Sequence, residues 1–216
     1  MMAIAEERLS RRALSKERRR RQLIDATIKC IAKKGLGSLT LANVAKEAGL
    51  SQGIVNLHFN SKDNLLSETL RFLIEDYDAQ FMQTVEKAPD EAAKTLLALM
   101  EMDLKPAICD RRKLSVWFAF WGEAKAVPTY QKICATYDDK YGEIIRQLCE
   151  RIISEGDYND VNAQTVTEAL SSMTDGLWLS CLINPKSFDR TTALHAINSY
   201  LTAVFPKHFK PQEGRE

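Results

Sequence analysis

Apolar residues recur along most of this chain with the three- to four-residue spacing of an amphipathic helix. Residues 20–35 show the pattern most clearly: their aliphatic side chains form one stripe (Leu23, Ile24, Ile28 and Ile31), and the segment ends in Lys-Lys-Gly, a common helix stop. Similar patterns follow up to residue 205, and no stretch alternates apolar and polar residues over the length of a strand. The pattern predicts an all-α chain of about nine helices.

Two of these expected helices are short, residues 41–48 and 52–59, and a turn that contains Gly49 joins them. Thr40 and Ser51 precede them and are good N-caps, while a glycine suits the left-handed residue that ends the first helix. Two short helices joined by about three residues that include a glycine form a helix-turn-helix. An ordinary helical hairpin with a solvated polar face has the same caps, so the spacing alone leaves both interpretations open.

The second short helix has one face for the core and another that can read DNA. Val55 and Phe59 are four residues apart and point into the core. Glutamine and asparagine side chains pair with adenine in the major groove, and an apolar tip meets the methyl group of thymine. A glycine lets the backbone come close to the DNA. The residues expected at base edges are Gln52, Gly53, Asn56 and Leu57.

Charge is distributed unevenly along the chain, although the formal net charge is only +1. Residues 1–62 contain thirteen Lys and Arg against five Asp and Glu, a net charge of +8. Residues 63–216 contain seventeen against twenty-four, a net charge of −7. A basic N-terminal quarter that carries a helix-turn-helix favours binding to the phosphate backbone of DNA. A purely structural helical adaptor would not explain this division.

The positive charge is densest in residues 10–22, SRRALSKERRRRQ. Its four consecutive arginines, Arg18–Arg21, either attract a phosphate strand or the minor groove, or belong to a solvated chain end without a specific role. We expect residues 1–17 to form a basic, flexible arm that is disordered up to about residue 15 without DNA.

The order of these parts resembles the TetR family of bacterial repressors. The resemblance rests on a leading helix, the motif G-[LV]-S-x-G-x-x-x-x-[HY]-F and the motif x-x-K-x-x-L at the start of a long fourth helix. The matching residues are Gly49, Leu50, Ser51, Gly53, His58, Phe59, Lys62 and Leu65. The resemblance implies that Thr40, Ser51, His58 and Lys62 hold DNA phosphates, with Arg18 and Arg19 adding attraction. The chain departs from the family at Asn56, where many members carry a tyrosine that contacts phosphate.

Segments such as WFAFW and DGLWLS are similar to a choline-responsive branch of this family, which represses genes of glycine betaine synthesis. The resemblance implies a homodimer on a pseudo-palindromic double-stranded operator, paired through helices at about 161–184 and 188–205. Residues 169–183 are apolar almost all round, which agrees with a dimer but also with the central helix of a monomer. We therefore expect a DNA-binding domain at residues 18–62 and a helical ligand-binding and dimerisation domain at residues 63–216.

Aromatic residues in the C-terminal part are candidates for binding a cationic effector. Aromatic faces hold quaternary ammonium groups, often beside a carboxylate. The expected ligand residues are Trp117, Trp121, Tyr137, Tyr141, Asp175 and Trp178, with Glu123 as another possible carboxylate. Ordinary core packing explains aromatic residues at helical spacing equally well. If these residues bind an effector, we expect choline or a related quaternary ammonium compound. The alternative is a regulator of an efflux or catabolic operon that responds to another cationic or hydrophobic molecule.

The remaining composition narrows the class of protein. Five scattered cysteines without C-x-x-C spacing indicate reduced thiols in a cytoplasmic protein. The longest apolar run, residues 116–121, is too short to cross a membrane. The three histidines lie far apart, and no nucleotide-binding, serine-hydrolase or metal-ligand motif is present. An all-α enzyme is therefore a remote alternative, and we expect no metal and no cofactor.

Overall fold

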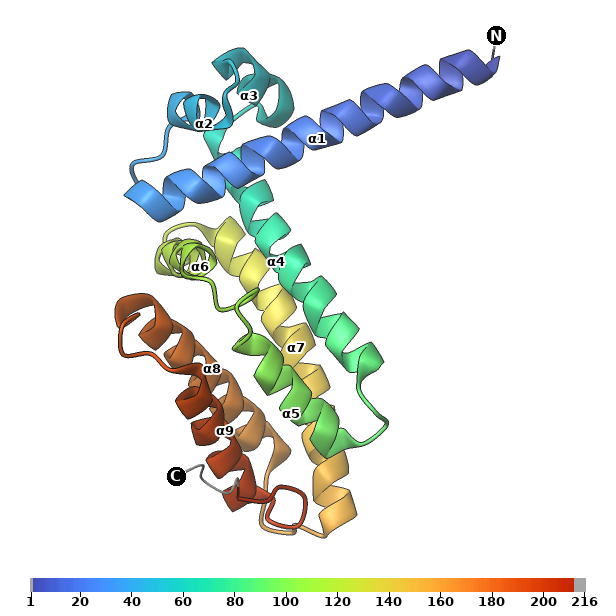
Figure 1. Ribbon diagram of the computed structural model, residues 1–216, viewed down its shortest axis with the longest axis vertical. Coiled ribbons are helices and arrows are strands. Elements are labelled where there is room, and N and C mark those ends of the chain that lie inside the picture. The colour runs from blue at the N-terminus through green and yellow to red at the C-terminus, as the bar shows by residue number, and fades with distance from the viewer. Residues whose placement is uncertain (1, 212–216) are drawn as a thin grey trace. The chain divides into compact units, whose positions relative to one another are not determined.

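The computed structural model describes the backbone of residues 2–211 and the side chains of residues 13–211. Within the described backbone the chain forms nine α-helices and no strand, which confirms the all-α fold class (Figure 1). None of the helices in this range is long and apolar enough to span a bilayer. In chain order the helices are α1 (Met2–Lys34), α2 (Leu41–Ala48), α3 (Gln52–Phe59), α4 (Lys62–Lys87), α5 (Ala92–Asp103), α6 (Arg111–Glu123), α7 (Pro128–Gly156), α8 (Ala163–Ile183) and α9 (Arg190–Val204).

The chain divides into two compact units. The first contains Met1–Leu73 and Ser115–Gln131, and the second contains Ile74–Leu114 and Lys132–Glu216. The division falls inside α4, α6 and α7, so these three helices each contribute to both units. The expected boundary between residues 62 and 63 and the expected flexible arm both stay predictions. In this structure residues 2–17 form the first half of α1.

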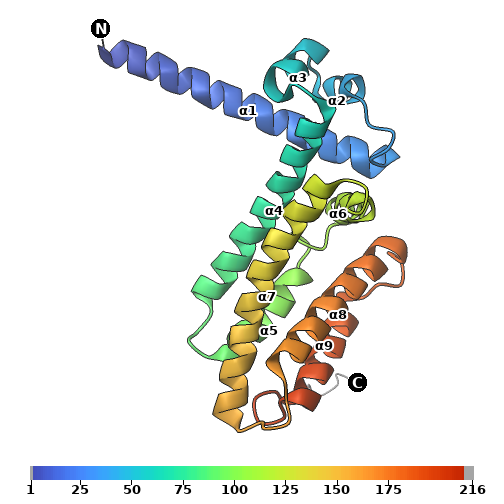
Figure 2. The same cartoon turned by 180° about the vertical axis from the view of Figure 1, so that it is seen from behind.

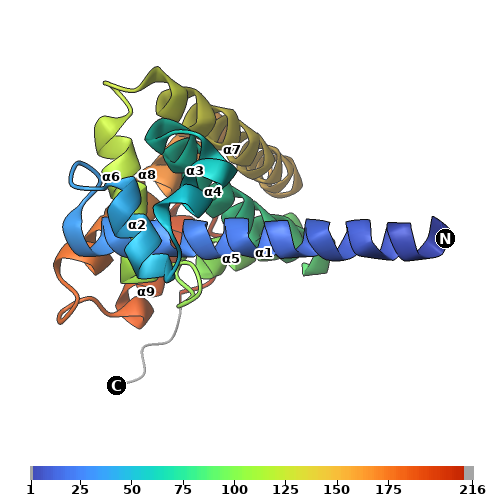
Figure 3. The same cartoon turned by 90° about the horizontal axis from the view of Figure 1, so that it is seen from above.

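The first unit is built around α1, α2 and α3, and both short helices lie on the same side of α1 (Figures 1 and 3). The apolar stripe on α1 faces α2, and Leu23 and Ile24 are completely buried. Val44 of α2 and Val55 of α3 are also completely buried, and Phe59 closes the same core at the end of α3. This small core fixes which face of α3 points away from the protein.

The second unit contains the C-terminal part of α4, α5, most of α7, and the pair α8 and α9, which run side by side (Figures 1 and 2). Leu99 on α5, Leu170 on α8 and Leu201 on α9 are completely buried in its core. Both final helices begin with capped N-termini, because Asn162 accepts a hydrogen bond from the N–H of Thr165 and Asp189 accepts one from Thr192. The two helices lie within the ranges that the sequence predicted for dimerisation.

Candidate DNA-binding surface and effector site

The turn between α2 and α3 follows from residues next to one another in the sequence. Thr40 caps α2, since its hydroxyl oxygen accepts a hydrogen bond from the N–H of Asn43 at 3.1 Å. Gly49 ends α2 in the left-handed region at φ 65°, and the next N–H, of Leu50, reaches back to the carbonyl of Ala45 at 2.9 Å. This is the C-terminal motif that glycine favours. Ser51 occupies the N-cap position of α3 as expected, but the capping hydrogen bond expected from its side chain is not formed.

The Ser51 side chain makes no capping hydrogen bond to α3. Its own backbone carbonyl accepts the N–H of Ile54 at 3.0 Å, which closes the first turn of α3 without the hydroxyl. Ser51 is exposed, so its hydroxyl can donate to an external acceptor. This position agrees with the phosphate contact that the family resemblance implies.

The four residues expected at base edges lie together on the exposed side of α3. Val55 and Phe59 are buried, and Leu57 keeps 74% of its surface exposed. An isolated exposed leucine is common on protein surfaces, but here it stands among polar side chains that suit base edges. The exposed residues are Gln52, Gly53, Asn56 and Leu57. The predicted orientation of the helix is confirmed, whereas the DNA contacts themselves stay predictions.

His58 differs from the other phosphate candidates because its surroundings disfavour a positive charge. Burial is the main reason that the pKa of His58 is lowered, and the positive charge of Lys16 on α1 contributes. A neutral imidazole is therefore expected near pH 7. His58 can then hold a phosphate as a hydrogen-bond donor, while Lys62, at the start of α4, supplies a full charge.

Two of the four arginines in Arg18–Arg21 have structural partners that the sequence did not reveal. Arg20 forms an ion pair with Glu68 on α4. The guanidinium of Arg21 lies 3.6 Å from the centre of the Phe72 ring. These contacts join α1 to α4 inside the first unit. Arg18 is exposed, and Arg19 donates to Gln22, one turn along α1, at 2.7 Å. Among the described residues neither arginine is hydrogen-bonded or ion-paired to α4, so these two are better placed to attract DNA.

A cluster of aromatic rings occupies the second unit, with contributions from α4, α7 and α8. The ring of Tyr77 meets Tyr141 edge-on at 5.0 Å and Trp178 edge-on at 6.0 Å between ring centres. Phe81 lies 4.7 Å from Tyr141, and Tyr137 lies 6.2 Å from it. Three of the predicted ligand residues, Tyr137, Tyr141 and Trp178, therefore belong to one cluster.

Asp103, at the end of α5, is the buried carboxylate of this cluster and was missed by sequence reasoning. Only 4% of it is exposed. The hydroxyl of Tyr77 donates to its Oδ1 at 2.7 Å, and the indole N–H of Trp178 donates to its backbone carbonyl at 2.9 Å. Burial raises the pKa of Asp103 to about 7, and the nearby charge of Asp175 acts in the same direction. Helical spacing was the signal that could have identified it, because Asp103 follows Leu99 by four residues and Leu96 by seven and so falls on the apolar face of α5.

Asp175 on α8 adds a second carboxylate with a perturbed pKa. Desolvation raises the pKa of Asp175 to about 6, and the charge of Asp138 on α7 adds to this, although part of the Asp175 side chain stays open to solvent. Among the described residues, no lysine or arginine forms an ion pair with Asp103, Asp138 or Asp175. Asp103 contacts Tyr77, and the charges of Asp175 and Asp138 add to burial in raising the pKa of Tyr77 and of Tyr141, respectively. These carboxylates favour a cation, and one basic group already lies near a ring, because the Lys140 amine is 5.9 Å from the centre of Tyr141.

Trp117 and Trp121 belong to the first unit, whereas the aromatic cluster belongs to the second. Both lie on the part of α6 assigned to the first unit, where their ring centres are 6.1 Å apart and Phe118 meets Trp121 edge-on at 5.2 Å. The six residues predicted for the effector site are thus divided between the two units. Only Tyr137, Tyr141, Asp175 and Trp178 lie in the second unit, and Trp178 is buried with its N–H already bonded.

Two short helices, α2 and α3, on a small N-terminal core, followed by a larger all-helical unit, are the arrangement of a helix-turn-helix DNA-binding protein. Comparison with known proteins gives the family. Residues 23–69 match the family of bacterial regulatory proteins named tetR, and residues 92–206 match the C-terminal domain of BetI-type transcriptional repressors. The chain belongs to the TetR family, is of BetI type in its C-terminal half, and is a transcriptional regulator rather than an enzyme.

Curated relatives and solved structures agree with this assignment. The chain is 31% identical over 186 residues to the HTH-type transcriptional regulator BetI of Paraburkholderia phymatum, covering 86% of this chain and 92% of that one. It is 29% identical over 187 residues to BetI of Burkholderia thailandensis, covering 86% and 93%. A transcriptional regulator from Pseudomonas aeruginosa PAO1 superimposes with a TM-score of 0.80 at 24% identity over 90% and 95% of the two chains. A regulator from Saccharomonospora viridis, solved in complex with choline, gives a TM-score of 0.74 at 24% identity over 84% and 94%.

Proposed function

We propose that this regulator is a homodimeric cytoplasmic repressor whose effector is choline or a closely related quaternary ammonium compound, and that it controls genes of choline and glycine betaine metabolism. The observation that carries the proposal is the cluster in the second unit, where Tyr77 packs against Tyr141 and Trp178 and donates a hydrogen bond to Asp103. Neither Asp103 nor Asp175 has an ion-pair partner among the described residues. The choline complex of the related regulator from Saccharomonospora viridis supports the same chemical class.

A quaternary ammonium group suits this cluster for a physical reason. Its charge is spread over methyl groups that cannot donate strong hydrogen bonds, so it is held by ring faces and by nearby negative charge. Tyr77 and Tyr141 offer rings from two different helices, and Asp175 offers a carboxylate that solvent still reaches. Burial is the main cause of the raised pKa of Asp103 and of Asp175, and a neighbouring carboxylate adds to each shift, Asp175 for Asp103 and Asp138 for Asp175. A bound cation would offset the part that comes from these neighbouring charges.

The DNA part of the proposal assigns α3 to the major groove. Gln52, Gly53, Asn56 and Leu57 meet base edges, and Thr40, Ser51, His58 and Lys62 hold phosphates with help from Arg18 and Arg19. α4 begins at Lys62 and continues to Tyr77 in the effector cluster. Effector binding at Tyr77 can therefore act on a helix that also enters the DNA-binding unit, and such coupling typically weakens binding by about 5–150-fold.

The proposed dimer uses the outer face of α8 and α9. Leu179 is 42% exposed and Ile183 is 61% exposed, both on α8, although they are large apolar residues. A groove of about 320 Å³ follows the same helix pair, with Leu177 on α8 and Ala196 on α9 in its lining. A second copy of the chain would cover this face by two-fold symmetry and set the spacing of two recognition helices.

A fluorescence-anisotropy titration tests the proposal. DNA from immediately upstream of the gene is titrated at about 50 and 200 mM salt, with and without millimolar choline, because phosphate contacts make affinity fall steeply with salt. Salt-sensitive binding that choline weakens is the expected result. If a bulkier organic cation releases the DNA and choline does not, the proposed effector is contradicted. If the protein shows no salt-dependent binding to any DNA, the assignment of α3 as a DNA-binding surface is contradicted.

Two variants separate the roles of α3 and α4 in the same assay. Asn56→Ala removes a base-reading side chain, so it should reduce the preference for the operator over unrelated DNA. Lys62→Ala removes a phosphate contact, so it should weaken binding to all DNA sequences alike. It should also reduce the slope of log affinity against log salt concentration by about 0.9. If both variants retain the parent's affinity and specificity, the assignment of α3 and α4 is wrong.

A further inference from the structure

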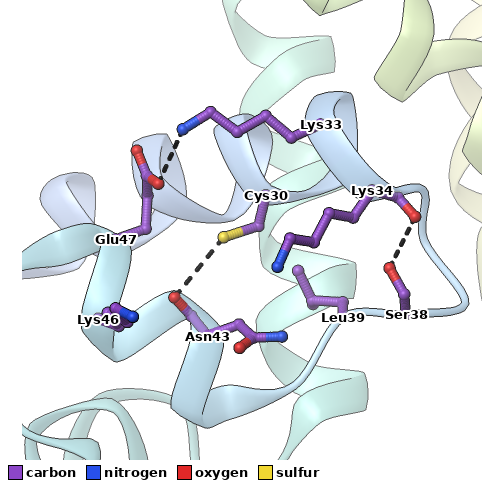
Figure 4. A pocket seen from close by; sticks show the side chains of 8 residues that line it. All are labelled: Cys30, Lys33, Lys34, Ser38, Leu39, Asn43, Lys46 and Glu47. Atoms are coloured by element: carbon purple, nitrogen blue, oxygen red, sulfur yellow. Dashed lines mark hydrogen bonds and ion pairs between the residues drawn. The ribbon is translucent and has the colours of Figure 1, made fainter.

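A second pocket lies in the first unit and contains none of the residues assigned to DNA or effector. It has a volume of about 390 Å³ and is formed by the C-terminal end of α1, the loop after it and α2 (Figure 4). Cys30 and Leu39 contribute its buried part, and the Cys30 thiol donates a weak hydrogen bond to the carbonyl of Asn43 at 3.7 Å. This contact joins α1 to α2 across the pocket.

The pocket is positively charged. Three lysines line it, and only Lys33 has an ion-pair partner among the described residues, Glu47, at 3.0 Å. Neither amine of Lys34 and Lys46 has an acceptor in the described part of the chain. The lining therefore carries two uncompensated positive charges. In Figure 4 the side chain of Lys34 extends over the pocket, with its nitrogen next to Leu39.

Lysines at helix C-termini often serve only to balance the helix dipole, and these three lie in the last turns of α1 and α2. Two of the carbonyl groups in the last turn of α1 already have other partners, however. The Ser38 hydroxyl donates to the carbonyl of Lys34 at 2.7 Å, and the N–H of Gly35 donates to Ile31 at 2.8 Å. The amine of Lys34 is thus not needed as a cap and is available to a ligand.

The remaining donors define the chemistry of that ligand. Two ammonium groups, from Lys34 and Lys46, and the side-chain amide of Asn43 line one pocket. Two positive charges with an additional neutral donor match a phosphoryl group, which carries about two negative charges as free phosphate and one as a DNA phosphodiester, and whose oxygens accept charge-assisted hydrogen bonds. We propose that this pocket binds a phosphoryl group, either as free phosphate or as a phosphate of the DNA backbone.

Both sources are consistent with the position of the pocket. Ser38 and Leu39, in its lining, directly precede Thr40, which is assigned to a DNA phosphate at the start of α2. A DNA phosphate held here would extend the protein's contact with the duplex beyond α3 and α4, and this source rests on the proposed function. Binding of free phosphate does not depend on it.

The test compares two double variants with the wild-type chain. Lys34→Gln/Lys46→Gln removes the two uncompensated charges of the pocket. Lys105→Gln/Lys125→Gln removes the same total charge from two exposed lysines outside it. All four lysines are exposed, so neither pair should prevent folding, and cooperative thermal unfolding verifies this. The single variant Lys46→Gln provides a milder change for the same measurements.

Inorganic phosphate is first titrated calorimetrically at constant ionic strength, with sodium chloride as the control salt. If the pocket binds free phosphate, the pocket variant should raise the Kd by about tenfold or more, because charge-assisted hydrogen bonds are lost. The control variant should bind as the wild type does. Anisotropy titrations on operator DNA then give the salt slope, which should fall by about 0.9 in the pocket variant if a DNA phosphate is bound.

Either a selective change in phosphate affinity or a selective change in salt slope supports the proposal and identifies the source. The proposal is overturned if the pocket variant equals the control variant in both titrations. Lys62→Ala in the same DNA titration keeps this outcome separate from failure of the proposed function, since that variant tests the phosphate contact at α4 alone.

Discussion

Replacing the buried carboxylate Asp103 by asparagine should make the protein less sensitive to alkaline pH. The side chain is 4% exposed, and burial raises its pKa to about 7. An unfolded chain has an aspartate pKa near 3.9. The native state therefore binds more protons than the unfolded state between these values, and its free energy of unfolding falls as pH rises through this window.

The size of the effect follows from the difference between the two pKa values. Each pKa unit corresponds to about 1.4 kcal/mol, so a shift of about three units corresponds to about 4 kcal/mol in total. From about pH 5.5 to about pH 8 the Asp103 contribution to stability should fall by about 2 kcal/mol. Asp103→Asn has no such titration, and its Oδ1 can still accept the hydrogen bond from Tyr77.

Urea unfolding followed by far-ultraviolet circular dichroism measures this difference at fixed protein concentration, because a dimer's apparent stability depends on concentration. The wild type should lose about 2 kcal/mol more than Asp103→Asn between the two pH values. Asp160→Asn, at an exposed aspartate of the same unit, should keep the wild-type pH dependence. Parallel pH profiles for wild type and Asp103→Asn would refute the reasoning, because the carboxylate would then not be desolvated by the fold.

Three further outcomes follow from the same structure. Choline affinity measured by calorimetry should rise as pH rises through about 6, where Asp175 ionises, and Asp175→Asn should bind more weakly with a flatter profile; an unchanged profile would exclude Asp175 from the site. Ile183→Asp should shift the chain from dimer to monomer in sedimentation, because it places a charge on the exposed apolar face of α8; an intact dimer would place the interface elsewhere. Glu68→Gln should lower the free energy of unfolding by less than about 1 kcal/mol, since its pair with Arg20 is partly exposed; a much larger loss in thermal unfolding would show that this pair anchors α1 to α4.

The parts of the fold that depend on neighbouring residues were predictable. Thr40 and Gly49 act within a few residues of their own positions, so caps and turn could be read directly from the sequence. Ser51 shows the limit of such reasoning, because the backbone carbonyl of the same residue closes the turn of α3 and leaves the hydroxyl unused. The partners of Arg20 and Arg21, Glu68 and Phe72, lie on another helix, and no local pattern indicates them.

The effector cluster was only partly predictable, because it depends on which helices meet. Helical spacing placed Trp117 and Trp121 on one helix correctly, but spacing within a helix carries no information about the unit to which that helix contributes. Tyr77 looked like one more residue of a long amphipathic helix. Only the structure shows that Tyr77 belongs to the effector cluster, because α5 places Asp103 within hydrogen-bond distance of the Tyr77 hydroxyl.

The sequence has a basic N-terminal part and an acidic C-terminal part, and the charged side chains without ion-pair partners in the two units show the same division. In the first unit, the amines of Lys34 and Lys46 have no acidic partner among the described residues, while Asp103 and Asp175 in the second have no basic one. Unpaired charges cost stability when they are crowded or desolvated, so a protein selected for stability alone would pair them. Here the unpaired charges of each unit are opposite in sign to the charge of the ligand proposed for that unit. Binding of a phosphate to one and of a cation to the other would each relieve repulsion that the free protein retains, which provides a favourable electrostatic contribution at both sites.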